Sequence, residues 1–212
     1  MTRNSKIVIL SSGTFIGKAC YTYFLQHQYN NTTLIELTDF SSIAGILQAQ
    51  APDYVFAVIG DSGSIAYNQA HPTALMRANL GQALEVIPAC ASPSIKRVVL
   101  LGSSCMYPVS AQQPIKETAL WQGMPEKTSL SYASAKCAVH QLAMAYNQQL
   151  GENRFVTLVH NTVFGTEDSN DSEKAHVISA LITKLYQAKQ AGEKTVTLWG
   201  TGTPQREFLY IT

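Results

Sequence analysis

A hydroxyl, a thiol, a phenol and an amine follow one another along the chain in an order that suits ketone chemistry. Ser103 and Cys105 lie in the segment Leu101–Pro108, and Tyr132 and Lys136 follow, four residues apart. Residues four apart share one face of a helix, and a neighbouring ammonium lowers the pKa of a phenol. We therefore expect Ser103 to hold a substrate carbonyl oxygen and Tyr132 to give it a proton as a hydride reaches carbon.

These side chains need a scaffold that brings them to one edge. Apolar runs typical of buried strands occur at Ile7–Leu10, Thr33–Leu37, Tyr54–Ile59, Val98–Leu101 and Phe155–Val159. Helical spacing separates them, at Ile16–His27, Ile43–Gln50, Pro72–Cys90 and Leu130–Leu150. This alternation predicts an α/β fold, a doubly wound parallel sheet with helices on both faces. Ser103 would then lie at the carboxyl end of the fourth strand, the edge where such sheets bind ligands.

The first strand leads into a loop that is a candidate phosphate site. In a doubly wound sheet a dinucleotide places its pyrophosphate against the N-terminus of the first helix. The residues expected there are Ser11, Gly13, Thr14, Phe15, Ile16 and Gly17. The alternative is a plain strand-to-helix turn in a sheet that binds no cofactor.

The pattern changes after Gly165. A polar loop over Thr166–Glu173 precedes a predicted helix at His176–Ala191, and short strands are predicted at Thr195–Trp199 and Glu207–Ile211. We expect residues 1–165 to form one domain and residues 166–212 to begin a second, substrate-binding lobe that is incomplete where the sequence stops.

Composition narrows the partners. The formal net charge is +1 and no run of Lys or Arg occurs, which argues against nucleic acid and acidic membranes. The first residues offer too short an apolar run for a signal peptide or a membrane span, so we expect a cytoplasmic protein. Its four cysteines lack the spacing of a metal site or a disulfide framework, so no metal is expected.

The strand-end Ser followed by Tyr-x-x-x-Lys resembles the short-chain dehydrogenase/reductase superfamily. The Cys two residues after that Ser narrows the resemblance to the GDP-L-fucose synthase family within the extended, NAD-dependent epimerase/dehydratase group. That likeness implies a Rossmann-like fold and a 3,5-epimerase/4-reductase acting on a GDP-4-keto-6-deoxyhexose. It runs from Ile7 to Leu209. We also expect a homodimer, because an unfinished lobe leaves strand edges and apolar surface uncovered.

The resemblance assigns further roles. Inverting a carbon beside a carbonyl needs a base on one side and an acid on the other. Cys105 and His176 match the family's pair, although a lone His at a helix start is often only a surface residue. Trp199 and Arg206 match a substrate-binding segment in which Arg206 would hold the diphosphate, unless it pairs with Glu207.

The sequence leaves two candidate cofactors, NADP(H) and NAD(H). The family implies NADP(H), which Lys136 would hold by its ribose. Aligning the family's three glycines puts Ser11 and Thr14 at the first two, and the Arg residues that meet a 2′-phosphate are absent. Glu36 ends the second strand, where an acidic residue suits the free ribose of NAD(H) or is only a solvated charge. Other readings are a related nucleotide-sugar epimerase or reductase, and a catalytically silent relative that acts as a binding module.

Overall fold

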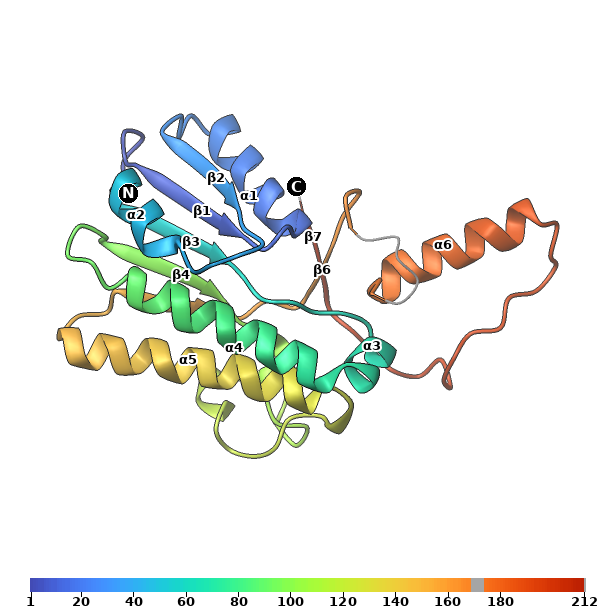
Figure 1. Cartoon of the computed structure of the whole chain (residues 1–212). Helices are drawn as coiled ribbons and strands as arrows, with labels where there is room; N and C mark the ends of the chain where they lie inside the picture. Colours follow the sequence, from blue (N-terminus) through green and yellow to red (C-terminus); the bar gives the residue numbers. More distant parts are fainter. Residues whose placement is uncertain (169–173, 212) are drawn as a thin grey trace.

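A five-stranded parallel sheet forms the body of the protein in a computed structural model that describes residues 1–168 and 174–211 (Figure 1). The strand order is β2-β1-β3-β4-β5, and each neighbouring pair is parallel. The strands are β1 (Ile7–Ser11), β2 (Thr32–Glu36), β3 (Tyr54–Val58), β4 (Arg97–Leu101) and β5 (Phe155–Leu158). Each lies within one residue of its predicted ends, which confirms the doubly wound, Rossmann-like sheet.

Helices cover the two faces unequally. One face packs against α1 (Phe15–Gln26) through Ile7, Ile9 and Phe24. The other face packs against α2 (Ile43–Gln50), α4 (Pro72–Ala89) and α5 (Leu130–Leu150), and holds the larger apolar core. All five residues of β1 are buried, as expected of a central strand covered on both sides.

Coverage on the α1 side does not reach the edge strand. Val156 and Leu158 of β5 point away from the larger core and are 39% and 53% exposed. Helices on both faces are thus confirmed for the sheet, and at the edge strand β5 the covering helix is α5 on one face. The two exposed positions of β5, Val156 and Leu158, are as apolar as the buried Phe155, so the sequence could not show this difference.

Several elements were not predicted. Helix α3 (Ile65–Ala70) follows β3, and Ser64 caps it by accepting the Tyr67 N–H at 3.1 Å. Three short 3₁₀ turns, η1 (Ser104–Met106), η2 (Glu117–Ala119) and η3 (Lys127–Ser129), lie between β4 and α5. Strand β6 (Thr162–Phe164) pairs in parallel with β7 (Phe208–Tyr210) in a separate two-stranded sheet.

The segment after Gly165 contains one predicted helix and one predicted strand that does not form. Helix α6 (Val177–Gln190) forms as predicted and stands to one side of the main sheet (Figure 1). The predicted strand at Thr195–Trp199 is wrong, because this segment pairs with no strand and the Trp199 side chain is 87% exposed. Part of the predicted polar loop at Thr166–Glu173 lies outside the described residues. No helix in the described ranges is long and apolar enough to cross a membrane.

Candidate functional site

The turn that follows β4 presents Ser103 at the carboxyl edge of the sheet. The Ser103 backbone is extended, and its Oγ accepts the Cys105 N–H at 3.2 Å. The next amide, that of Ser104, donates to the His160 carbonyl oxygen at 3.1 Å, which ties the turn to the end of β5. A Cβ on Gly102 would lie 3.0 Å from methyl groups of Thr157 and Val159, so glycine allows β4 and β5 to converge here.

Helix α5 brings Tyr132 and Lys136 to the same place. Tyr132 is 9% exposed, and its hydroxyl lies close enough to the Ser103 side chain for Ser103 to lower the pKa of the phenol. Lys136 is 7% exposed, and its Nζ donates to the carbonyl oxygens of Ile59 at 3.1 Å and Leu101 at 3.2 Å. The Lys136 Nζ lies 5.9 Å from the centre of the Tyr132 ring. The structure therefore brings the three residues together from β4 and α5.

The predicted effect of Lys136 on Tyr132 is wrong in this structure. Burial raises the pKa of Tyr132 to about 12, although the Ser103 hydrogen bond opposes this and the charges of Cys105 and Asp61 add to it. Burial also lowers the pKa of Lys136 to about 8. The ammonium is bonded to two backbone carbonyls instead of the phenol, and a buried phenol favours its neutral form. Tyr132 is thus protonated at neutral pH, the state from which it can donate a proton.

Sequence reasoning missed two residues that shape the space around Lys136. Gly60 follows β3 with φ +108, and a Cβ there would lie 2.2 Å from Asn79 Oδ1 and 2.8 Å from Lys136 Nζ. The Gly60 N–H donates to Gln82 Oε1 at 2.6 Å. Asn79, on α4, is 2% exposed and donates to the carbonyl oxygen of Asp61 at 2.8 Å. A glycine directly after a buried strand was the available signal.

The thiol and imidazole proposed to act together approach the centre from different segments. Cys105 is half-buried in η1 and lies close enough to Tyr132 for a thiolate at this position to raise the pKa of the phenol. His176 is the N-cap residue of α6. No hydrogen bond joins Cys105 to His176 in the part of the chain that the structure describes. The site as described therefore unites Cys105 with the reducing residues but leaves His176 without a direct bond to them.

His160 is a titratable group at this edge to which the sequence assigned no role. Its Nδ1 donates to the Asn161 carbonyl oxygen at 2.7 Å. Burial lowers the pKa of His160; the Asn161 hydrogen bond opposes this, and the charges of Lys136 and His176 reinforce it. His160 is therefore neutral at pH 7 and lies within electrostatic reach of two predicted site residues.

The loop between β1 and α1 accommodates a serine where the family has glycine. Ser11 is fully buried, and its Oγ accepts the Gly13 N–H at 3.1 Å. A Cβ on Gly17 would lie 2.5 Å from Ser11 Oγ, so the side chain of Ser11 fills the space that Gly17 leaves. Gly13 adopts φ +84, a conformation that suits glycine.

The same loop keeps the features that an anion needs. Thr14 is the N-cap residue of α1, Phe15 and Ile16 open the helix, and its first turn contains no acidic residue. The first amides of a helix lack partners within it and favour negative charge. Thr14 Oγ1 is buried without a hydrogen-bond partner. These residues fit a dinucleotide pyrophosphate, and the ribose end would meet Glu36, whose carboxylate lies 4.0 Å from Lys18 Nζ.

Trp199 and Arg206 are the predicted substrate contacts in the tail. Both are exposed and belong to the irregular segment between α6 and β7. The alternative pairing of Arg206 with Glu207 is absent among the described ion pairs, because Glu207 Oε2 accepts the Asn161 side-chain amide at 2.6 Å instead. Among the described residues, no hydrogen bond, ion pair or ring contact joins Trp199 or Arg206 to Tyr132.

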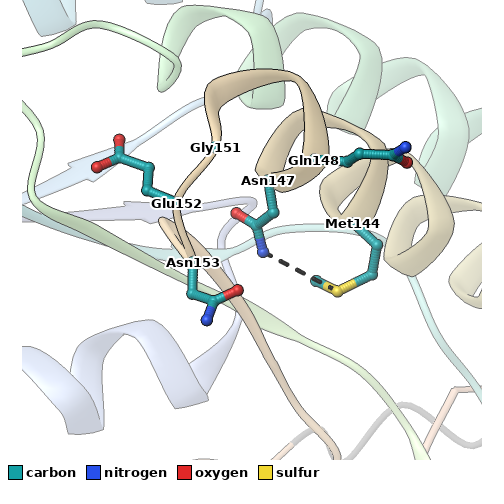
Figure 2. A pocket seen from close by; sticks show the side chains of 6 residues that line it. All are labelled: Met144, Asn147, Gln148, Gly151, Glu152 and Asn153. Carbon is teal, nitrogen blue, oxygen red and sulfur yellow. Dashed lines mark hydrogen bonds between the residues drawn. The ribbon is translucent and has the colours of Figure 1, made fainter.

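A hollow at the other end of α5 is a structural feature. It has a volume of about 410 Å³ and is lined by Met144, Asn147, Gln148, Gly151, Glu152 and Asn153. The Asn147 side chain both donates to and accepts from the Phe155 backbone at 2.8 Å, and also meets Met144 Sδ (Figure 2). Fifteen residues of helix place it about 22 Å from Tyr132. Its polar groups are used in holding β5 to α5.

The site combines a Ser at the sheet edge, a Tyr-x-x-x-Lys pair on a helix and a loop suited to a dinucleotide. This combination is typical of dinucleotide-dependent reductases and epimerases, and comparison with known proteins gives the same class. The chain belongs to the NAD dependent epimerase/dehydratase family, whose model matches residues 7–212. It is similar to a probable GDP-L-fucose synthase 1 of Oryza sativa subsp. japonica, with 31% identity over 99% of this chain and 65% of that protein. A GDP-L-fucose synthase of Sinorhizobium fredii is 35% identical over 83% of this chain and 56% of its own length.

Solved structures give the same result. A GDP-mannoheptose C4 reductase from Campylobacter jejuni, solved with NADP bound, superposes with a TM-score of 0.86 and 31% identity, covering 99% of this chain and 70% of that one. The chain spans about two thirds or less of the length of the curated relatives it matches.

Proposed function

We propose that this protein is an NAD(P)H-dependent nucleotide-sugar epimerase/reductase that inverts and reduces a GDP-4-keto-6-deoxyhexose. The observation that carries the proposal is the placement of Ser103, Tyr132 and Lys136 together and buried at the carboxyl edge of the sheet, with Cys105 two residues after Ser103. The similarity to GDP-L-fucose synthases and to a GDP-sugar C4 reductase supports the base and the sugar class.

The reductive half uses groups already in their working states. Ser103 holds the C4 carbonyl oxygen, and the protonated Tyr132 gives that oxygen its proton. A bound nicotinamide supplies the hydride. Lys136 holds the nicotinamide ribose and, through its bonds to Ile59 and Leu101, fixes the ends of β3 and β4 around the reacting atoms.

The epimerising half uses Cys105 and His176. One removes the acidic proton beside the carbonyl and the other returns a proton from the opposite face of the sugar ring. Cys105 lies at the same edge as Ser103. In this proposal Trp199 and Arg206 contact the nucleotide diphosphate, and residues 166–212 belong to a substrate-binding lobe separate from residues 1–165.

For the cofactor we propose NADP(H) bound by Ser11, Gly13, Thr14, Phe15, Ile16 and Gly17, with NAD(H) as the second candidate. Relatives solved with NADP and NADPH support the first. Glu36 at the end of β2 supports the second, since a carboxylate there accepts hydrogen bonds from an unphosphorylated ribose.

The setting of the protein is also a proposal. We propose a cytoplasmic homodimer. The free thiols of Cys20, Cys90, Cys105 and Cys137 suit a reducing compartment. Met76 and Leu84 of α4 are 38% and 58% exposed and offer an apolar face to a second copy.

Two substitutions separate the halves of the reaction. With a GDP-4-keto-6-deoxyhexose as substrate, Tyr132→Phe is expected to abolish NAD(P)H oxidation while solvent deuterium still exchanges beside the carbonyl. Cys105→Ser is expected to stop that exchange, and Cys20→Ser serves as the matched control. Unchanged reduction by Tyr132→Phe would refute the reductive assignment, and absence of both activities in the folded wild type would favour a silent binding module.

A further inference from the structure

The loop after β3 is a rigid part of the site edge. The carbonyl oxygen of Ile59 accepts Lys136 Nζ at 3.1 Å, that of Gly60 accepts Ser12 Oγ at 2.7 Å, and that of Asp61 accepts Asn79 Nδ2 at 2.8 Å. Three successive carbonyls are therefore bonded to side chains from three other segments. The Asp61 carboxylate is presented from a fixed backbone.

The tail returns to this loop through a single lysine. Lys174 Nζ lies 3.3 Å and 3.5 Å from the two carboxylate oxygens of Asp61. It also lies 4.9 Å from the centre of the Tyr67 ring on α3, a cation–π distance. Burial opposes the charged form, but the charge of Asp61 and bonds to Tyr67 and Asp61 outweigh it and raise the pKa of Lys174. Lys174 is charged at neutral pH.

This contact lies immediately before the imidazole assigned to epimerisation. Lys174 precedes His176 by two residues, and Ala175 between them is 4% exposed. Helix α6 beyond His176 is poorly covered, since Ile182 and Tyr186 are both 62% exposed. Ser179 and Ala188 are the buried residues of α6, and the Ser179 hydroxyl donates to the Asp168 carboxylate. The Lys174 contact is thus a second attachment, on the N-terminal side of His176.

We propose that Lys174 is a positioning residue: its ion pair with Asp61 and its contact with Tyr67 hold His176 at the sheet edge that carries Cys105. The inference rests on the proposed epimerase function and adds to it. Neither Lys174 nor Asp61 touches the reacting sugar in this account. Loss of the Lys174 side chain should affect the epimerising half, because Lys174 has no described contact with Ser103, Tyr132 or Lys136. The charge of Asp61 also acts on Tyr132, so the rate of the reductive half is compared in the Lys174 variants.

The expected effect is modest, because the side chains of Lys174 and Asp61 are 40% and 35% exposed and solvent screens such pairs. We expect Lys174→Met to slow solvent deuterium exchange into the 4-keto sugar by about two- to fivefold. Reduction of an already inverted 4-keto sugar stays at the wild-type rate. Lys174→Arg restores exchange. Lys189→Met, which changes an exposed lysine near the end of α6, is the matched control.

A double-mutant cycle gives the specific signature. Asp61→Asn is expected to lower exchange by no more than Lys174→Met, because Lys174 keeps its contact with the Tyr67 ring. The double variant is expected to be no slower than Lys174→Met alone. High salt brings wild type toward the variants. The proposal would be overturned if Lys174→Met slowed deuterium exchange and ketone reduction equally. It would also be overturned if the double variant exchanged more slowly than Lys174→Met alone.

A readout without substrate separates this inference from the proposed function. The amide of Ala180 donates to the His176 carbonyl oxygen at 2.9 Å in the first turn of α6. We expect its hydrogen exchange to rise in Lys174→Met and not in Lys189→Met. Unchanged protection would refute the anchoring itself. A second outcome is faster amide exchange at Ala180 in Lys174→Met together with no deuterium incorporation into the sugar by the wild type. That outcome would support the anchoring, refute the epimerase function and leave the anchor without a catalytic consequence.

Discussion

The contact between Ser11 and Gly17 allows a test whose sign depends on the background. A Cβ added at Gly17 would lie 2.5 Å from Ser11 Oγ and 2.7 Å from Ser11 Cβ, both atoms of a fully buried side chain. Overpacking of this kind costs about 1–3 kcal/mol. Replacing a helical glycine by alanine otherwise gains about 0.5–1 kcal/mol. We expect Gly17→Ala to destabilise the wild-type protein by up to about 2.5 kcal/mol as the difference of these two.

Ser11→Gly removes both clashing atoms. Alone it costs the hydrogen bond to the Gly13 N–H, about 0.5–1.5 kcal/mol. Glycine in a strand adds about 0.5–1 kcal/mol to that cost. In this background Gly17→Ala no longer clashes, so it should stabilise by about 0.5–1 kcal/mol. The double variant then differs from the sum of the single variants by the overpacking, about 1–3 kcal/mol.

Urea unfolding of the four proteins measures these free energies. The reasoning is refuted if Gly17→Ala destabilises equally with and without the Ser11 side chain. A double variant that recovers stability and binds nicotinamide dinucleotide would show that Ser11 fills space between β1 and α1 and does not obstruct the phosphate side of the loop.

Two further outcomes follow from the described groups. Burial lowers the pKa of His140 and His160, so the unfolded chain binds more protons than the folded one just below pH 6.5. The free energy of unfolding should therefore fall as the pH drops through that range. His140→Gln should reduce the difference between the free energies measured by urea unfolding at pH 5.5 and pH 7. Gly60→Ala places a Cβ 2.8 Å from Lys136 Nζ on a backbone with φ +108. It should destabilise the protein by about 1–3 kcal/mol and weaken dinucleotide binding. Gly45→Ala, which adds a Cβ in open space, is the control, and equal stability of the two variants would contradict the packing described.

The reducing centre could be predicted from sequence because periodicity carries it. Buried strands read as continuous apolar runs, so the end of β4 and hence the place of Ser103 followed directly. Helical spacing then put Tyr132 and Lys136 on one face of α5. The structure brings all three together at the predicted edge.

The electrostatics and the tail could not be predicted in the same way. The pKa of Tyr132 depends on how deeply it is buried and on which oxygens accept hydrogen bonds from Lys136 Nζ. Both are set by tertiary packing, so the spacing of residues along the chain does not predict them. The segment Thr195–Trp199 has strand-forming residues, but a strand needs a partner and β6 pairs with β7 instead. The Lys174–Asp61 pair joins residues 113 apart, a separation that no motif encodes.

The central claim is that this chain has a working nicotinamide site beside Ser103, Tyr132 and Lys136. Titration with NADPH and with NADH, followed by nicotinamide fluorescence, tests it most directly. The account predicts saturable binding of one of the two at micromolar concentration, and weaker binding by the Gly60→Ala variant. Absence of binding of either dinucleotide to a folded sample would contradict the account and favour a silent relative.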